Sequence, residues 1–381
     1  MTSNKVQEKI NTSSNNTSAP SADSSTEGQG FFAFFCPVLI MTVAVLLVSI
    51  GIGSVRISPV DILTILKNQL FGSALPDRLD DTTVSVLMQI RIPRVLSSFL
   101  VGGILSAAGL VMQAVLQNPL ASSYTLGVSS GASLGAALAV ISGLSGGALG
   151  YFLLPVFGFT GALITVLIVL VFCSALDARV TGTTIILLGM VVALFANALI
   201  TLICSLNTQY TNRIFTWQMG SFAGRRMIHV LILFVCAVIC LFILALYARE
   251  LDILTFGDEQ ASIIGVNTIR VKKIILATAS LMTGIAVCFT GTIGFVDLIV
   301  PHIVRRLYGP AHKKALPLTF FYGGAFLALA DTLARTLISP REIPVGAVTA
   351  LIGAPFFVYL YFGKNPTFGR KNTESRIGGR V

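Results

Sequence analysis

The feature that most constrains this chain is an 82-residue stretch, between Arg94 and Asp177, that contains no Asp, Glu, Lys or Arg. One membrane-crossing helix needs about 20 predominantly apolar residues, so this stretch alone has room for several. A soluble globular domain carries about 25% charged residues, whereas this 381-residue chain carries 11%. The sequence therefore predicts an all-α polytopic membrane protein and excludes a soluble domain.

The remaining charges lie between further apolar runs. A charge at the centre of a spanning helix costs about 2.5–3.5 kcal/mol on insertion scales. The other runs without Asp, Glu, Lys or Arg are residues 28–55, 180–212, 227–248, 274–296 and 343–363. A transmembrane β-barrel would show short segments of alternating hydrophobicity instead, so these long runs are interpreted as helices.

The apolar runs predict a transmembrane domain over residues 31–363, between a disordered polar tail at 1–30 and a basic tail at 364–381. The expected spans are 31–53, 93–116, 123–142, 151–174, 183–206, 227–247, 271–292, 295–308, 316–337 and 344–362. Ser58 and Pro59 predict the start of a short interfacial helix, because Ser caps helices and Pro suits their first turn. Small residues allow close packing of membrane helices, so their density in the second and third spans predicts that these two are central.

Composition alone leaves the crossing of residues 295–308 open. If this segment crosses, the side of both termini holds 16 basic residues and the other side holds 10. The positive-inside rule then places both termini in the cytoplasm. If it does not cross, the counts are 9 and 17, with the N-terminus outside. Ten spans are favoured because nine would require export of the polar N-terminal tail.

Several kinds of chemistry are missing from the sequence. No GxxxxGK[ST] sequence occurs, so the chain is not expected to bind ATP through a P-loop. No HExxH sequence or Cys/His cluster with zinc spacing is present, which argues against a metal site or a metalloprotease. No basic stripe indicates nucleic-acid binding. We therefore expect no catalytic residue, metal ligand or nucleic-acid partner.

The few ionisable residues near the predicted helix ends each have two interpretations. Asp331 and Arg335 are four residues apart on one helix face. They form a local ion pair, or Arg335 stays free to face a partner. Arg91 and Arg94 anchor a helix at the interface, or they dock a carboxylate from an external protein, because the planar guanidinium matches a carboxylate. An ion-coupled transporter would be expected to show more buried carboxylates.

A series of motifs runs in order from about residue 40 to residue 363. They are Arg91-Ile92-Pro93-Arg94, Gly109-Leu110-Val111-Met112-Gln113, Asn118-Pro119-Leu120-Ala121, Gly127-Val128-Ser129-Ser130-Gly131-Ala132, Trp217 with Met219-Gly220-Ser221-Phe222, residues 257–267, Gly294-Phe295-Val296, Pro301-His302-Ile303-Val304-Arg305, Ala330-Asp331 and Ile343-Pro344-Val345-Gly346. Together they resemble the iron-chelate and vitamin B12 permease family (FecCD-type), the membrane subunits of bacterial ABC importers.

The resemblance implies a ten-helix permease fold like that of the vitamin B12 importer, a type II ABC importer, and so favours the ten-span alternative. It implies a multi-pass protein of the bacterial cytoplasmic membrane, surrounded by lipid, with both termini cytoplasmic. A second permease copy or a paralogue would complete the translocation pathway. Partner ATPase subunits would bind ATP and Mg, and an extracellular or periplasmic substrate-binding protein would deliver the ligand. No cofactor is expected on this chain.

A ferric siderophore is the expected cargo, with haem or cobalamin as alternatives within the family. An ion-coupled secondary transporter is the rival from a different class. The segment 248–270 mixes charged and apolar residues at helical spacing, which predicts short surface helices. In the family this segment couples the permease to the ATPase.

The resemblance also assigns site residues by motif. Docking of the binding protein falls to Arg91, Arg94 and Arg335. ATPase coupling falls to Gly257, Asp258, Glu259, Ala261, Gly265 and Val266. A translocation pathway lined by small and weakly polar residues gives Met112, Gln113, Asn118 and Pro119 as candidates. The chain departs from the family pattern at two places: Ser122-Ser123 replace the usual Asp-Pro, and Asp297 stands where many members have Gly.

Overall fold

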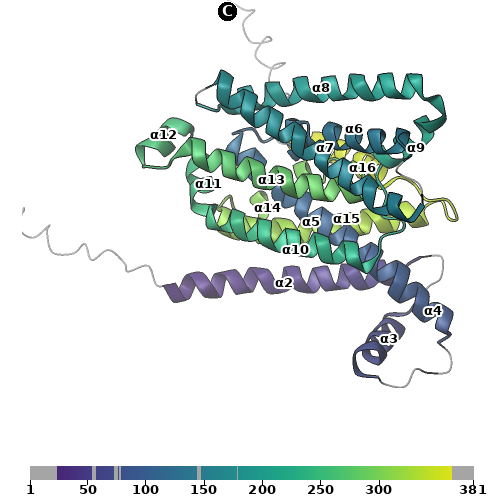
Figure 1. Cartoon of the computed structure of the whole chain (residues 1–381). Coiled ribbons are helices and arrows are strands. Elements are labelled where there is room, and N and C mark those ends of the chain that lie inside the picture. The colour runs from purple at the N-terminus through teal and green to yellow at the C-terminus, as the bar shows by residue number, and fades with distance from the viewer. Residues whose placement is uncertain are drawn as a thin grey trace, which may run out of the picture.

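The computed structural model describes residues 24–53, 57–72, 76, 79–143, 147–177 and 179–362, and these ranges contain helices and turns but no strand. Ten helices run roughly side by side along one axis (Figure 1). They are α2 (Ser24–Gly51), α5 (Ile92–Val115), α6 (Val128–Ile141), α7 (Gly147–Leu176), α8 (Gly182–Leu206), α10 (Met227–Leu246), α13 (Thr268–Thr290), α14 (Val296–Tyr308), α15 (His312–Thr336) and α16 (Val345–Phe362). The all-α prediction is confirmed.

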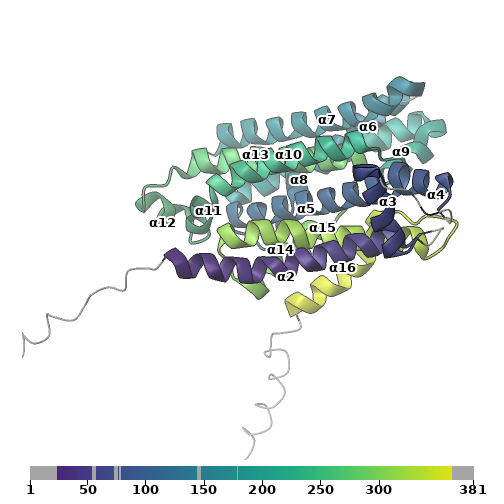
Figure 2. The same ribbon diagram turned by 90° about the horizontal axis from the view of Figure 1, so that it is seen from below.

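Short helices gather at the two ends of this bundle (Figures 1 and 2). One end, called the α4 end, carries α3 (Pro59–Phe71), α4 (Asp81–Ser85) and α9 (Thr211–Gln218). The opposite α12 end carries α11 (Ala248–Leu254) and α12 (Asp258–Ile263). The predicted cap of α3 is confirmed, because Ser58 Oγ accepts a hydrogen bond from Asp61 N at 3.1 Å. The short helices over 248–270 are confirmed, whereas α9 was not predicted.

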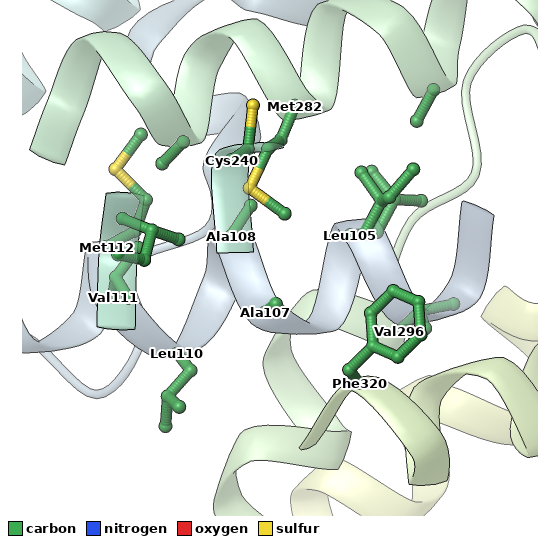
Figure 3. Packing of buried hydrophobic residues seen from close by; sticks show 14 of the residues in the cluster. Leu105, Ala107, Ala108, Leu110, Val111, Met112, Cys240, Met282, Val296 and Phe320 are labelled. Atoms are coloured by element: carbon green, nitrogen blue, oxygen red, sulfur yellow. The ribbon is translucent and has the colours of Figure 1, made fainter. Parts of the chain in front are cut away.

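The second predicted span, which forms α5, lies at the centre of the bundle, as its small residues predicted. In the continuous helical segment Asp81–Val115, 94% of the most apolar window is buried. It packs against α10, α13, α14 and α15. A Cβ added at Gly102 would lie 2.2 Å from the Gly323 carbonyl oxygen on α15, so only glycine permits this approach. Figure 3 shows side chains of α5 reaching Cys240 and Met282 on one side and Val296 and Phe320 on another.

Three predicted helix boundaries are wrong. α2 begins at Ser24, inside the tail predicted to be disordered, because adding turns to an existing helix costs far less than starting one. The second span begins at Asp81, twelve residues before Pro93, through a π-helix over Val86–Arg91. The third predicted span, 123–142, is not one continuous helix. Gly127, with a φ of 75°, separates a 3₁₀ turn over Ser123–Leu126 from α6.

The segment before α14 crosses the bundle with part of its backbone unwound. α14 has 13 residues, or roughly 20 Å at 1.5 Å per residue, which is shorter than a bilayer core of about 30 Å. Residues 291–295 extend this segment, and both backbone polar groups of Ile293 have partners inside the protein. Tyr124 Oη donates to Ile293 O at 2.8 Å and accepts from Ile293 N at 3.2 Å. Such backbone is tolerated at membrane depth only where protein surrounds it.

The periphery of the bundle is apolar and exposed. In the most apolar windows of α8 and α10, 22% and 33% of the residues are buried. Their large exposed side chains are Leu, Ile, Val, Met and Phe, which a bilayer or another apolar surface must cover. The first 23 residues and the predicted basic tail at 364–381 lie outside the described residues.

Candidate functional site

At the α4 end, Arg94 joins α5 to α15 and to the loop that follows α15. Its Nε and Nη2 donate to the fully buried Asp331 at 2.9–3.2 Å, and its Nη1 donates to Glu342 at 2.7 Å. A guanidinium that donates two hydrogen bonds to one carboxylate is among the stronger polar contacts in proteins. Arg94 is therefore already paired twice inside the chain.

Two more arginines hold the end of α2. Arg91 Nη1 donates to the carbonyl oxygens of Ile50 at 3.2 Å and Gly51 at 3.4 Å, and Arg335 Nη2 donates to that of Ser49. The last carbonyls of a helix have no partner within the helix, and positive charge is favourable there. The cost of burying both guanidiniums is thus offset by their hydrogen bonds to the end of α2.

The local ion pair that the spacing of Asp331 and Arg335 predicts is one of the contacts of Arg335. Its Nε lies 3.9 Å from Asp331 Oδ2, and the side chain is 8% exposed. The local ion pair is therefore present, although Arg335 Nε donates no hydrogen bond among the described residues. Sequence spacing could not show that Arg94, 237 residues away in sequence, takes the closer contact with Asp331. Docking of an external carboxylate at Arg91, Arg94 and Arg335 stays a prediction.

In the middle of the bundle, Asp297 ties the loop after α5 to the start of α14. Asp297 is 1% exposed. Its Oδ2 accepts hydrogen bonds from Ser122 Oγ, from Ser123 N at 2.9 Å and from Ser123 Oγ at 2.9 Å. The other oxygen, Oδ1, has no hydrogen-bond partner among the described residues. Ser122-Ser123 and Asp297, the two places where the chain departs from the family pattern, therefore contact each other. Considered together, the two departures could have indicated this contact.

The four pathway candidates fall into two pairs. Met112 is fully buried in the core cluster, on the side of α5 that faces Cys240 and Met282 (Figure 3). Gln113 is also buried, donating to Asp297 O at 3.3 Å and accepting from Arg305. Asn118 is partly exposed and Pro119 is exposed, in the turn that ends α5. Only this second pair can meet a ligand in the described conformation, so a pathway at these residues stays a prediction.

At the α12 end, three residues of the bundle anchor the surface helices to it. Lys272 of α13 is 1% exposed, and its Nζ lies 2.5 Å from Asp258 Oδ2 and 3.3 Å from Val180 O. Gln117, after α5, donates to Leu254 O and Asp258 Oδ1, both at 3.2 Å. His312 N, at the start of α15, donates to Asp252 Oδ1 at 2.8 Å. These contacts tie α11 and α12 to α13, to the end of α5 and to the start of α15.

Glycines shape the segment 248–270, and its outer face is apolar. Gly257 and Gly265, on either side of α12, have φ values of 116° and 95°, which side-chain-bearing residues rarely adopt. Ala261 is fully buried, whereas Glu259 is exposed. Phe256, Ile263 and Ile264 are strongly exposed. An exposed apolar patch of this kind marks a contact surface.

Sequence reasoning missed the anchors Lys272, Gln117, Asp252 and His312. The partners of each lie 14 to 141 residues away, so no helical spacing connects them. Lys272 carried one signal, because it is a charge at the edge of an apolar run. Among the described residues, no three His, Cys, Asp or Glu side chains gather as a metal site would require.

Comparison with known proteins identifies the family to which this helical bundle belongs. Residues 41–362 match the FecCD transport family. The chain belongs to this family. It is therefore a permease of the ABC importer class, and the fold and transport function that its motifs predicted are confirmed.

Relatives within the family differ in their named cargo. The chain is 39% identical to the uncharacterized ABC transporter permease protein YvrB of Bacillus subtilis, over 83% of this chain and 89% of that protein. It is 36% identical to the cobalamin import system permease protein BtuC of Halobacterium salinarum, over 76% and 77% of the two chains. It is 35% identical to the Fe(3+)-citrate import system permease protein YfmE of Bacillus subtilis, over 85% and 93%.

A solved structure supports the same assignment. The fold resembles an inward-facing conformation of a metal-chelate type ABC transporter, with a TM-score of 0.74 and 28% sequence identity. The likeness covers 87% of this chain and 99% of the other. The ten-helix type II permease fold is thereby confirmed.

Proposed function

We propose that this chain is the permease subunit through which an ABC importer moves a ferric siderophore across the bacterial cytoplasmic membrane, driven by ATP hydrolysis in a partner. The iron-citrate relative and the metal-chelate transporter support an iron chelate as the cargo. Haem and cobalamin are the alternatives, and the cobalamin relative favours the second of these. We place the α12 end, toward which α2 begins and α16 ends (Figure 2), in the cytoplasm.

The observation that carries the proposal is the anchored surface pair α11 and α12. Its outer side offers Phe256, Ile263 and Ile264 to a partner, and Asp258 and Asp252 on its inner side are held by Lys272 and His312. A partner ATPase that closes on ATP would push this pair, and the contacts would move α13 and α15 with it. We assign contact with the ATPase to Gly257, Asp258, Glu259, Ala261, Gly265 and Val266.

We propose that a second copy of this chain, or a paralogue, covers part of the exposed apolar surface of α8 and α16. The exposed residues of α8 include Leu194 and Phe195, and those of α16 include Leu351. Ligand would pass between the two subunits and meet the exposed turn at Asn118 and Pro119, with Met112 and Gln113 supporting this turn from within the bundle.

The proposal is tested by purifying the chain with its partner ATPase and reconstituting both in liposomes. We expect loaded substrate-binding protein to raise ATP hydrolysis severalfold over the unloaded protein. Failure of the chain to copurify with an ATPase, together with uptake driven by an ion gradient alone, would favour the secondary transporter instead. A panel of a ferric siderophore, haem and cobalamin identifies the cargo.

Docking of the binding protein is tested at Glu342, the replaceable partner of Arg94. The Glu342 side chain is 43% exposed, so an incoming carboxylate can take its place on Nη1 of Arg94. We expect Glu342→Gln to tighten docking by about tenfold, since a hydrogen bond to a charged group contributes about 1.5–3 kcal/mol. Arg94→Gln should weaken it. Surface plasmon resonance on variants with a wild-type gel-filtration profile measures both, and unchanged affinity in both variants at physiological salt contradicts the assignment.

A further inference from the structure

A cavity of about 490 Å³ opens at the α4 end, beside α9. α9 contributes Asn212, Arg213 and Trp217 to its wall, and the loop between α9 and α10 contributes Arg225. Phe289, near the end of α13, adds a second aromatic side chain. The volume falls within the range of about 300–1,000 Å³ that is usual for small-molecule sites. Arg94, Glu342, Asp258 and Lys272 do not line this cavity.

The residues that line the cavity favour a negatively charged ligand. It contains two guanidinium groups, and none of the described residues that line the cavity is acidic. Arginine recognises carboxylate and phosphate oxygens through a planar fork of donors. Aromatic faces and the amide of Asn212 add apolar contact and further hydrogen bonding. An organic anion with several oxygens therefore suits this wall better than a neutral molecule.

Two buried residues in the lining of the cavity argue against a lipid headgroup as its occupant. Val140 of α6 and Thr290 of α13 also line the cavity, and they are 1% and 3% exposed. In the most apolar window of α13, 72% of the residues are buried, against 22% for the peripheral helix α8. Part of the lining thus comes from the interior of the bundle and not from its lipid-facing side.

We infer that this cavity is a receiving subsite for an anionic, oxygen-rich metal chelate at the mouth of the permease. The inference rests on the proposed import function and narrows its substrate class to chelates that carry carboxylate or phenolate charge. Arg213 and Arg225 bind the ligand oxygens, and Trp217 with Phe289 packs against the organic part. The two arginines are thereby assigned as specificity-determining residues.

The chain provides its own probe, because Trp217 is its only tryptophan. The full-length protein in neutral-lipid nanodiscs is titrated with ferric citrate while tryptophan fluorescence is recorded. A neutral ferric hydroxamate at matched absorbance controls for optical filtering. We expect saturable quenching by ferric citrate, an apparent Kd raised about tenfold in Arg213→Gln and in Arg225→Gln, and little change in Arg226→Gln. Arg226 is exposed on the same loop and does not line the cavity.

Three results would overturn the inference. They are the absence of saturable quenching, equal quenching by the neutral chelate, and an unchanged apparent Kd in both cavity variants. Loss of quenching in nanodiscs that contain phosphatidylglycerol would assign the cavity to lipid and overturn it as well. ATPase stimulation by loaded binding protein, measured on the same variants, separates this failure from failure of the import function. Quenching without any stimulation would keep the subsite and reject the importer.

Discussion

Asp331→Asn is expected to lower the free energy of unfolding by about 3–5 kcal/mol, the usual loss when one partner of a buried ion pair is removed. The Asp331 carboxylate is fully buried and accepts two donors of Arg94, and it lies 3.9 Å from the guanidinium of Arg335. Both arginines would remain buried after the substitution, with Glu342 as the remaining carboxylate at 2.7 Å from Arg94. The cost of removing the guanidiniums of Arg94 and Arg335 from water would then be poorly compensated.

The measurement is equilibrium unfolding of the purified chain in mixed micelles, followed by far-ultraviolet circular dichroism. Glu342→Gln is the matched control, because it removes the other carboxylate of Arg94 from a position that is 43% exposed. Exposed ion pairs contribute about 0–1 kcal/mol, so this control should unfold close to the wild type. Equal losses in the two variants would refute the assignment of Asp331 as the central charge of the α4 end.

The apolar pattern predicted the helices well because length and composition alone decide which segments enter a bilayer. α7, α8 and α10 begin and end within a few residues of the expected bounds. Boundaries failed where tertiary contacts override local signals. Pro93 was expected to start a helix, yet the helix continues back through a π-turn to Asp81. There Arg91 holds the carbonyls at the end of α2, a contact that local sequence does not encode.

Sequence could single out charged residues but not what each one contacts. Motifs singled out Arg91, Arg94, Arg335 and Asp258, and all four have partners inside the chain. The pairing depends on which helices become neighbours, and no periodicity within one helix carries that information. Asp297 shows the converse, since its contact with Ser122 and Ser123 was signalled only by two simultaneous departures from the family pattern.

The second large effect is expected at the α12 end, where the ion pair of Asp258 and Lys272 is unequally buried. The Lys272 side chain is 1% exposed and that of Asp258 is 31% exposed. Asp258→Asn leaves an ammonium group buried beside Val180 O, whereas Lys272→Met leaves a carboxylate that reaches water and keeps Gln117 as a donor. The cost of an unpaired charge rises steeply with burial. The aspartate variant should therefore be the more damaging of the two.

We expect Asp258→Asn to destabilise the attachment of α12 by about 3 kcal/mol and Lys272→Met by about 1 kcal/mol. The double variant should recover most of the loss, because removing both charges also removes the unpaired one. Hydrogen–deuterium exchange of the α11 and α12 amides measures the attachment in the full-length chain, and the double-mutant cycle gives the coupling free energy. ATPase stimulation should fall in the same order, since a loosened α12 cannot pass motion to α13. Additive losses in the double variant would show that the two side chains act independently and that α12 is held by other contacts.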